Sequence, residues 1–408
     1  MTATHLGGAA TGTRDRSRPR AALPALCVTQ ITGWGILYYA FPVLLPHITA
    51  DTGWSTPRAT AAFTAALLLS ALVGIPVGRI IDRHGPRTVM TAGSALGAVA
   101  LVCIALAPDL PMFYAGWSLA GTAMAATFYQ PAFTALTRWH QPDHVRALTT
   151  VTLAGGLAST VFAPVTAALA AHLGWRTTYL LLAATLAALT IPLHALALRH
   201  PWPQAPRATA HPIGRSGTES PARTRPFLLL TAAFTLSGFA MHGVVFNTVP
   251  LLTERGAGPT TAAWALGLGG LGQTLGRTLY ATLARHTAVT TRTVLLIAAG
   301  GATTLLLALV PGPTALLVGI AVLAGAIRGN LTLLHATAVT DRWGTTAYGH
   351  LTARLGAPAA IAGALAPWAT AAVIPALGVG CPGLFGVLAV ISSVAALFAA
   401  VSTVRRSS

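Results

Sequence analysis

The chain of 408 residues contains 54% hydrophobic and only 8% charged residues, and its mean hydropathy is +0.67. Soluble domains usually carry about 25% charged residues, so this composition excludes an ordinary soluble protein and predicts a protein that crosses a membrane many times. The net charge of +17 is compatible with nucleic-acid binding, but the positions of the basic residues argue against that class.

All 25 basic residues are arginines, and they are unevenly distributed over the loops. Arg58, Arg176 and Arg255 fall on one set of alternating loops. Twenty others fall on the opposite set or near the chain ends, and Arg277 and Arg328 lie inside apolar segments. The positive-inside rule places the arginine-rich side in the cytoplasm. We therefore expect a multi-pass plasma-membrane protein with both termini cytoplasmic, partnered by the lipid bilayer and not by nucleic acid.

Apolar segments long enough to cross a bilayer, which takes about 20 residues, recur along the chain. They are predicted at 22–45, 58–81, 88–107, 112–136, 147–171, 176–198, 227–251, 260–283, 293–311, 314–338, 349–373 and 380–403. The polar residues 1–21 are predicted to be a disordered cytoplasmic tail, because the apolar run after them is too long for a signal-peptide core. Residues 199–226, rich in Pro, Arg, Ser and Thr, are predicted to be a flexible cytoplasmic linker. The linker separates two six-helix bundles, at 22–198 and 227–404.

The two halves also resemble each other at an offset of about 200 residues, which is the test for an internal repeat. The run Thr134-Ala135-Leu136-Thr137-Arg138-Trp139 returns as Thr337-Ala338-Val339-Thr340-Asp341-Arg342-Trp343. Ala163-Pro164 likewise returns as Ala366-Pro367. Parallel repeats with a site between them are an architecture of secondary transporters. We expect an all-α integral membrane protein with twelve transmembrane helices in two six-helix pseudo-symmetric bundles.

The loop between the second and third predicted helices carries a motif, Gly78-Arg79-Ile80-Ile81-Asp82-Arg83-His84-Gly85-Pro86-Arg87. It resembles the corresponding loop of major facilitator superfamily transporters. There a glycine, three residues, Asp-Arg, one residue and a glycine precede basic residues. The resemblance implies a conformational latch that steadies one access state, formed by Gly78, Asp82, Arg83, Gly85 and Arg87. The alternative is a charged turn that merely obeys the positive-inside rule.

Two smaller patterns refine this resemblance. Gly85-Pro86-Arg87 and Gly53-Trp54-Ser55 are similar to the monocarboxylate and oxalate/formate branch of the superfamily. The matching stretch of the second half, Gly276-Arg277-Thr278-Leu279-Tyr280, lacks the aspartate. We therefore expect one latch, not two.

Charged residues inside the membrane are functional by default, because they are unfavourable there. Arg328 lies deep in the tenth segment, where a guanidinium can hold a carboxylate through two hydrogen bonds. The alternative is an arginine satisfied by backbone carbonyls or by Asn330. Arg277 lies four residues after Gln273, on the same helix face. This spacing resembles an Asp–Arg pattern in the eighth helix of monocarboxylate transporters, with Gln273 in place of the aspartate.

The acidic residues all fall in tails, loops or helix ends, so no carboxylate is predicted at the membrane midplane. They are Asp15, Asp51, Asp82, Asp109, Asp143, Glu219, Glu254 and Asp341. Histidine is then the available titrating group, and His242, in the middle of the seventh segment, is either a packing residue or a proton carrier. Other candidate binding residues are Tyr38, Tyr39, Gln130 and Asn247.

These patterns predict a secondary active transporter that moves a small molecule, an organic anion such as a monocarboxylate, by alternating access, with a possible coupling proton. Two alternatives stay open. One is an efflux pump for a neutral or hydrophobic compound, in which Arg328 is structural. The other is a non-transporting membrane sensor of the same fold. Phosphate-binding loops, paired catalytic carboxylates and metal-ligand clusters are missing from the sequence. Cys27, Cys103 and Cys381 are isolated, so we expect neither an enzyme nor a cofactor.

Overall fold

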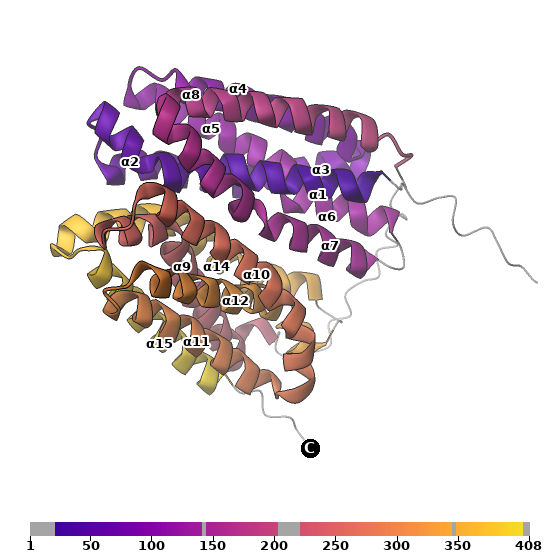
Figure 1. The fold of residues 1–408 in the computed structure, drawn as a ribbon. Helices are drawn as coiled ribbons and strands as arrows, with labels where there is room; N and C mark the ends of the chain where they lie inside the picture. The colour runs from indigo at the N-terminus through magenta and orange to yellow at the C-terminus, as the bar shows by residue number, and fades with distance from the viewer. Residues whose placement is uncertain (1–20, 141–143, 203–220, 345–347, 403–408) are drawn as a thin grey trace, which may run out of the picture.

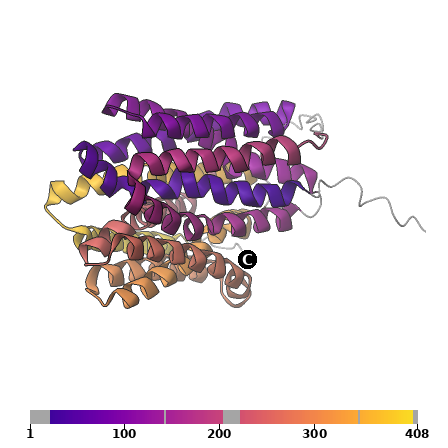
Figure 2. The same ribbon diagram turned by 45° about the horizontal axis from the view of Figure 1, so that its top comes forward.

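The computed structural model describes residues 21–140, 144–202, 221–344 and 348–402, and within these ranges the regular structure is helical, without a strand. Nearly all of the predicted tail and most of the predicted linker lie outside the described residues, so both stay predictions. Figure 1 shows two groups of helices, one from each half of the chain, and Figure 2 shows the same separation from another direction.

The first group contains α1 (Ala22–Gly33), the π-helix η1 (Trp34–Tyr39), α2 (Ala40–Thr52), α3 (Thr56–His84), α4 (Pro86–Ala105), α5 (Leu110–Thr127), α6 (Tyr129–Trp139), α7 (His144–Gly156) and α8 (Ala158–Ala197). The second contains the 3-10 turn η2 (Pro221–Arg223), α9 (Arg225–Glu254), α10 (Pro259–His286), α11 (Val289–Leu309), α12 (Thr314–Thr337), α13 (Thr340–Trp343), α14 (Tyr348–Leu377) and α15 (Cys381–Val401). Some crossings consist of more than one labelled helix. The segments α1, η1 and α2 follow one another without a gap, and α6 follows α5 after a single residue, Phe128.

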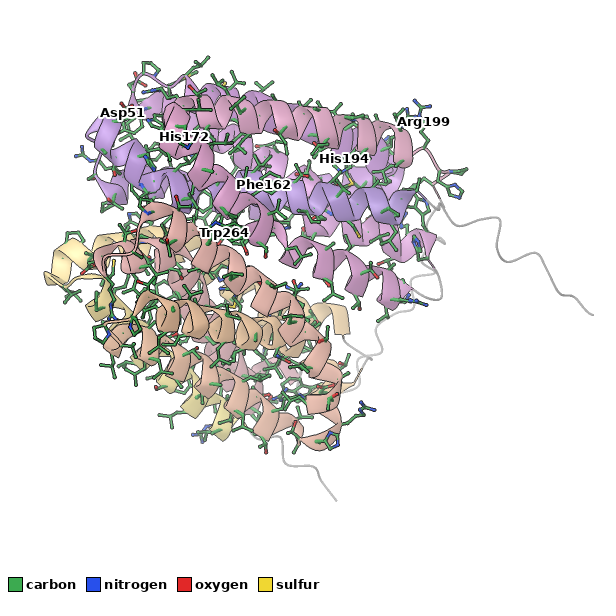
Figure 3. The ribbon with its side chains drawn as sticks, viewed as in Figure 1. Asp51, Phe162, His172, His194, Arg199 and Trp264 are labelled. Atoms are coloured by element: carbon green, nitrogen blue, oxygen red, sulfur yellow. The ribbon has the colours of Figure 1, made fainter. Side chains whose placement is uncertain are left out.

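The long helix α8 holds two crossings, because its backbone turns at Gly174. This residue has φ 72° and ψ 166°, a conformation that favours glycine. Figure 3 shows the reversal: Phe162 lies midway along the bundle, His172 at one end, and His194 and Arg199 at the other. Residues 144–173 and 175–197 are therefore separate passes, as the sequence predicts.

By length and composition, nine helical stretches of the described residues can cross a membrane, and His144–Ala197 is counted among them as one. Its turn at Gly174 makes it two passes. The broken pair α5–α6 and the glycine-rich α10 fall outside that count, yet both run within their bundles, so the described residues form twelve passes. We call the end where α1 begins, α8 ends, α9 begins and α15 ends the terminal end, and the opposite one the far end.

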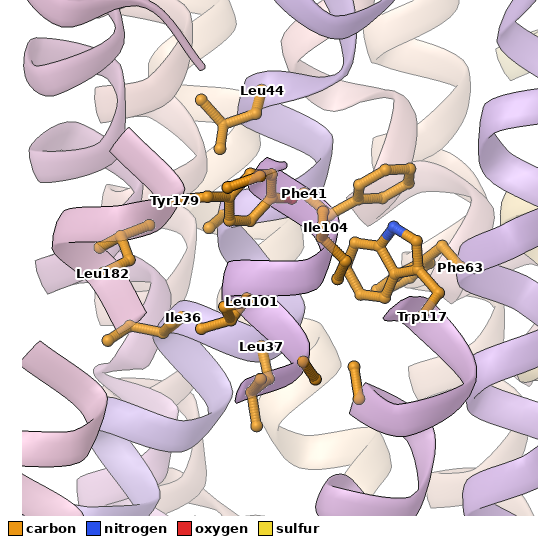
Figure 4. Packing of buried hydrophobic residues seen from close by; sticks show 14 of the residues in the cluster. Ile36, Leu37, Phe41, Leu44, Phe63, Leu101, Ile104, Trp117, Tyr179 and Leu182 are labelled. Carbon is orange, nitrogen blue, oxygen red and sulfur yellow. The ribbon is translucent and has the colours of Figure 1, made fainter. Parts of the chain in front are cut away.

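The core of the first bundle is a hydrophobic cluster rich in aromatic rings (Figure 4). Phe63 and Trp117 each lie seven residues after the start of their helices, α3 and α5, so these rings are towards the far end. Phe41 of α2 stacks on Phe63 of α3, with ring centroids 4.7 Å apart, and Trp117 of α5 meets both rings edge-on. Phe246 of α9 reaches this cluster from the second bundle, with its centroid 5.8 Å from Phe41 and 5.9 Å from Phe63. Since close packing drives helix association in a bilayer, these rings join the two bundles there.

Glycines bring α10 and α12 into backbone contact inside the second bundle. A Cβ at Gly276 would lie 2.0 Å from the carbonyl oxygen of Ala326, and one at Gly325 would lie 2.0 Å from that of Gly269. Such approach is possible only without side chains. The residues next to these contacts in sequence include Arg277 on α10 and Arg328 on α12. The glycine contact therefore sets the separation of the two membrane arginines.

Candidate functional site

A cavity of about 370 Å³ lies between the two bundles, with walls from η1, α6, α7, α9, α10, α12 and α14. It brings together most of the binding residues predicted from sequence. Those that line it are Tyr38, Tyr39, His242, Gln273, Arg277 and Arg328.

The π-helix η1 forms the part of the wall contributed by the first crossing. Its wider turn, with i→i+5 hydrogen bonding, is often found at functional sites. Trp34, Tyr38 and Tyr39 are at i, i+4 and i+5, and all three line the cavity. On the other side, a Cβ at Gly35 would lie 2.1 Å from the Phe162 ring. This contact holds η1 tightly against α8 and directs its aromatic residues inward.

Arg328 places a positive charge in the cavity. Its Nε is buried and has no hydrogen-bond partner among the described residues. Its Nη2 lies against α10, 3.9 Å from the Cβ position of Gly269. Tyr38 and Tyr39 are close enough to interact with the guanidinium electrostatically. Neither is a carboxylate, so Arg328 offers hydrogen-bond donors and an uncompensated charge to the cavity.

Arg277 is held differently, because its guanidinium bridges the two bundles. Its Nη1 donates to the backbone carbonyl of Thr152 on α7, and Tyr129 lines the same cavity. Ten residues before Arg277 on α10, the carbonyl of Gly267 accepts a hydrogen bond of 2.8 Å from the Thr160 hydroxyl of α8. Arg277 thus lines the cavity but is already partly satisfied by backbone oxygen.

The acidic residues of the described ranges do not neutralise these arginines. They lie at helix ends and have partners there. Three form ion pairs: Asp51 with Arg176, Asp82 with Arg138 and Asp341 with Arg292. Asp51 also accepts a hydrogen bond from the Trp175 indole, Asp109 accepts one from the backbone N–H of Met112, and Glu254 accepts one from that of Cys381. Within the described part of the chain, the cavity therefore carries two positive charges and no carboxylate.

His242 lies on α9 and lines the same cavity as Arg328. Its Nδ1 is 2.8 Å from the carbonyl oxygen of Gly238. A carbonyl only accepts hydrogen bonds, so the neutral ring carries its proton on Nδ1 and leaves Nε2 as an acceptor. The ring is fixed from behind by α14, where a Cβ at Gly363 would lie 2.9 Å from it.

Two predicted binding residues lie outside this cavity. Gln130 lines a neighbouring cavity instead. Asn247 is buried between α9 and α14, where its Nδ2 donates to the carbonyl of Gly243 and to Oγ1 of Thr370, the latter over 2.9 Å. Asn247 therefore joins two helices and is not part of the site that we describe. Ser237 and Thr332 do line the cavity, but short hydroxyl side chains are common in membrane helices and give no signal in the sequence.

The predicted latch residues lie at the terminal end of the first bundle. Asp82 accepts a hydrogen bond of 2.6 Å from Nη2 of Arg138 on α6. Trp202 donates to the Asp82 carbonyl over 3.1 Å and packs over Gly85, whose φ is +82°. Arg87 donates to the carbonyl of Ala195, whereas Gly78 has open space at its Cβ position and Arg83 is exposed. Residues 345–347, which precede α14, lie outside the described ranges.

The second bundle has an ion pair at the same end, although it lacks the loop aspartate. Asp341 accepts from Nη2 of Arg292 on α11 over 2.7 Å and from the Thr337 hydroxyl. Both bundles therefore have an ion pair at the terminal end, but the acidic residue lies at different positions. Asp82 is on the second crossing, whereas Asp341 follows the tenth crossing.

Asp82→Asn tests the latch. Because the Asp82 side chain is 55% exposed, losing the ion pair is expected to change the free energy of unfolding by no more than about 1 kcal/mol. If the loop acts as a latch, transport is expected to slow several-fold while substrate affinity stays unchanged. Flux and thermal unfolding of the same preparation measure both effects. Unchanged flux would contradict the latch and favour the alternative, a charged turn that merely obeys the positive-inside rule.

The helical fold and the arginine-lined cavity between two similar bundles are those of a membrane transporter. The family model of the Major Facilitator Superfamily matches residues 26–313, and the chain belongs to this superfamily. The predicted superfamily and the all-helical membrane fold are thereby confirmed.

Similar proteins agree with this assignment. Monocarboxylate transporter 13 of Bos taurus is 27% identical over 257 residues, 62% of this chain and 57% of that protein. Multidrug resistance protein MdtL of Shigella flexneri serotype 5b (strain 8401) is 31% identical over 235 residues, 55% of this chain and 58% of that protein. The chain thus spans a little over half the length of each. A bacterial homologue of the human lysosomal transporter Spinster, crystallised in an inward-facing and occupied conformation, shares the fold with a TM-score of 0.74. It is 17% identical, over 96% of this chain and 97% of that one.

Proposed function

We propose that the chain is a secondary active transporter of a small organic anion, moved by alternating access between the two bundles. The observation that carries this proposal is Arg328, a half-buried residue that lines the central cavity, has a buried Nε and has no carboxylate partner among the described residues. A charge in such a place is strongly unfavourable unless something pairs with it. A substrate carboxylate supplies two acceptors in the planar geometry that a guanidinium matches.

Access would alternate about the contacts between the bundles. Phe246 packs against Phe41 and Phe63 towards the far end, which favours a cavity reached from the terminal end in this conformation. The arginine distribution supports a cytoplasmic location for that end. Arg277 would couple binding to movement, since a substrate that draws its guanidinium away from the Thr152 carbonyl also loosens α10 from α7.

The proposal is tested by flux of labelled organic anions into proteoliposomes, with and without an imposed pH gradient. Arg328→Lys is the decisive variant. It keeps the charge but removes the planar pair of donors, so anion flux is expected to fall about tenfold or more. The name of the MdtL relative points to the alternative, an exporter of neutral or hydrophobic compounds. That alternative predicts that Arg328→Lys keeps full activity and that folded protein moves no anion.

We propose that His242 carries the coupling proton. In His242→Asn, the amide nitrogen can take over the hydrogen bond of Nδ1 to the Gly238 carbonyl, while the titrating Nε2 is lost. Anion exchange at equal pH is expected to continue, and stimulation by a pH gradient is expected to disappear. Uptake measured with and without the gradient checks this. Stimulation that persists would make His242 a packing residue.

A further inference from the structure

A second cavity of about 310 Å³ lies beside the first, between α3, α5, α6 and α14. Neither an arginine nor an acidic residue is among the described residues that line it. Its walls are mostly apolar, from Leu67 and Ala71 on α3, Met124 on α5, Phe128 at the α5–α6 break and Ala364 on α14. We call this space the apolar pocket. Nothing in the proposed function so far uses it.

The apolar pocket and the central cavity have a common wall. Trp34, Tyr38, Tyr129 and His242 line both spaces, so the two spaces adjoin at these four side chains. Tyr38 and His242 line the central cavity together with Arg328. A ligand held at Arg328 therefore reaches the apolar pocket by passing beside these two side chains.

The break between α5 and α6 shapes the pocket. Phe128 has φ −75° and ψ −160°, outside the helical region, and its ring stacks on Trp34 with centroids 4.1 Å apart and an interplanar angle of 20°. Behind it, the Cβ position of Gly33 lies 3.7 Å from the Phe128 ring. Held between α1 and η1, Phe128 forms a fixed aromatic wall.

We infer that the transported anion is an amphipathic monocarboxylate whose carboxylate binds Arg328 and whose apolar group, of the size of a branched chain or a ring, enters the apolar pocket. This rests on the proposed function and narrows its substrate class. Burying one more methylene there adds about fourfold in affinity. A second carboxylate at that end would meet no arginine among the lining residues, only His242 on the common wall and the neutral Ser70 and Gln130, so its charge would be poorly compensated. Short acids and dicarboxylates are thereby disfavoured.

The test is binding of matched acids to the purified full chain in nanodiscs by calorimetry. The probes are acetate, butyrate, hexanoate, phenylacetate, 3-phenylpropionate and the dicarboxylate adipate. Affinity is expected to rise about fourfold per methylene until the pocket is full, to be highest for the acids with a ring, and to be at least tenfold weaker for adipate than for hexanoate.

Ala71→Phe fills the pocket and is expected to remove the gain of the longer acids while acetate binds as before. Its control is Leu72→Phe, since Leu72 is 66% exposed on the same helix and does not line the pocket. Leu67→Ala is a second variant that adds no bulk. It is expected to weaken only the acids that reach the pocket.

The outcomes separate the inference from the function on which it rests. Equal affinity for short and long acids, or a uniform effect of Ala71→Phe on all of them, would overturn the inference and leave anion transport standing. Binding of uncharged analogues as tight as that of the acids, unaffected by Arg328→Ala, would overturn both. The same holds if the folded protein binds none of the acids.

Discussion

Arg328→Ala is expected to lower anion flux about thirtyfold or more. Losing one partner of a desolvated, hydrogen-bonded charge pair typically costs about 2–5 kcal/mol, and each 1.4 kcal/mol is a factor of ten in binding. The variant should fold well, because the guanidinium has no described partner to lose and its removal takes an unpaired charge out of a buried place. Thermal unfolding should therefore show equal or greater stability while transport is lost.

The matched control is Arg285→Ala. Arg285 is an exposed arginine in the last turn of α10, so its loss removes the same charge without touching the cavity. Flux close to that of the unchanged protein is expected. If both variants lose transport equally, the effect comes from overall charge. If Arg328→Ala transports anions normally, the proposed role of Arg328 is wrong.

Gly325→Ala is expected to destabilise the second bundle by about 1–3 kcal/mol, as overpacking typically does, and to impair transport. Its Cβ would lie 2.0 Å from the backbone oxygen of Gly269. A backbone atom cannot rotate away as a side chain can, so α12 must move from α10. Because Arg328 lies one turn further along α12, this movement also shifts the guanidinium within the cavity.

Gly319→Ala provides a control on the same helix, because nothing lies within 4 Å of its Cβ position. Alanine has a higher helix propensity than glycine by up to about 1 kcal/mol, so this variant should be as stable as the unchanged protein or more so. Thermal unfolding in detergent compares the two. Equal stability of Gly325→Ala and Gly319→Ala would contradict the tight contact between α10 and α12.

Each of the two repeats has an ion pair that joins two of its crossings, but the residues of the two pairs occupy different positions in the repeat. In the first bundle a pair between Asp82 and Arg138 ties the second crossing to the fourth. In the second bundle Arg292 of the third crossing binds Asp341 after the fourth. The offset between repeats shows that the aspartate is missing from the second loop. The offset does not show that Asp341 forms an ion pair in its place. Arg292 and Asp341 are 49 residues apart in sequence, and they meet only because α11 packs against α12.

The sequence by itself determined the class of this protein: the helices, the reversal between the fifth and sixth crossings, the two halves and the superfamily. It could do so because apolar length is a local property, and in lipid every backbone group must be paired within the helix. It also singled out Arg277 and Arg328, since an arginine in an apolar run is conspicuous in any packing arrangement.

Only the tertiary structure decided which polar residues share a space. Asn247 and His242 are five residues apart on α9, yet one joins α14 and the other faces the cavity. Arg277 is partly satisfied by Thr152, 125 residues away, which distinguishes it from Arg328. The π-turn that brings both Tyr38 and Tyr39 to the cavity, and the apolar pocket behind Phe128, also appear only in the folded chain. The direction of a side chain depends on the rotation of its helix against neighbours from distant segments, and no local pattern records that rotation.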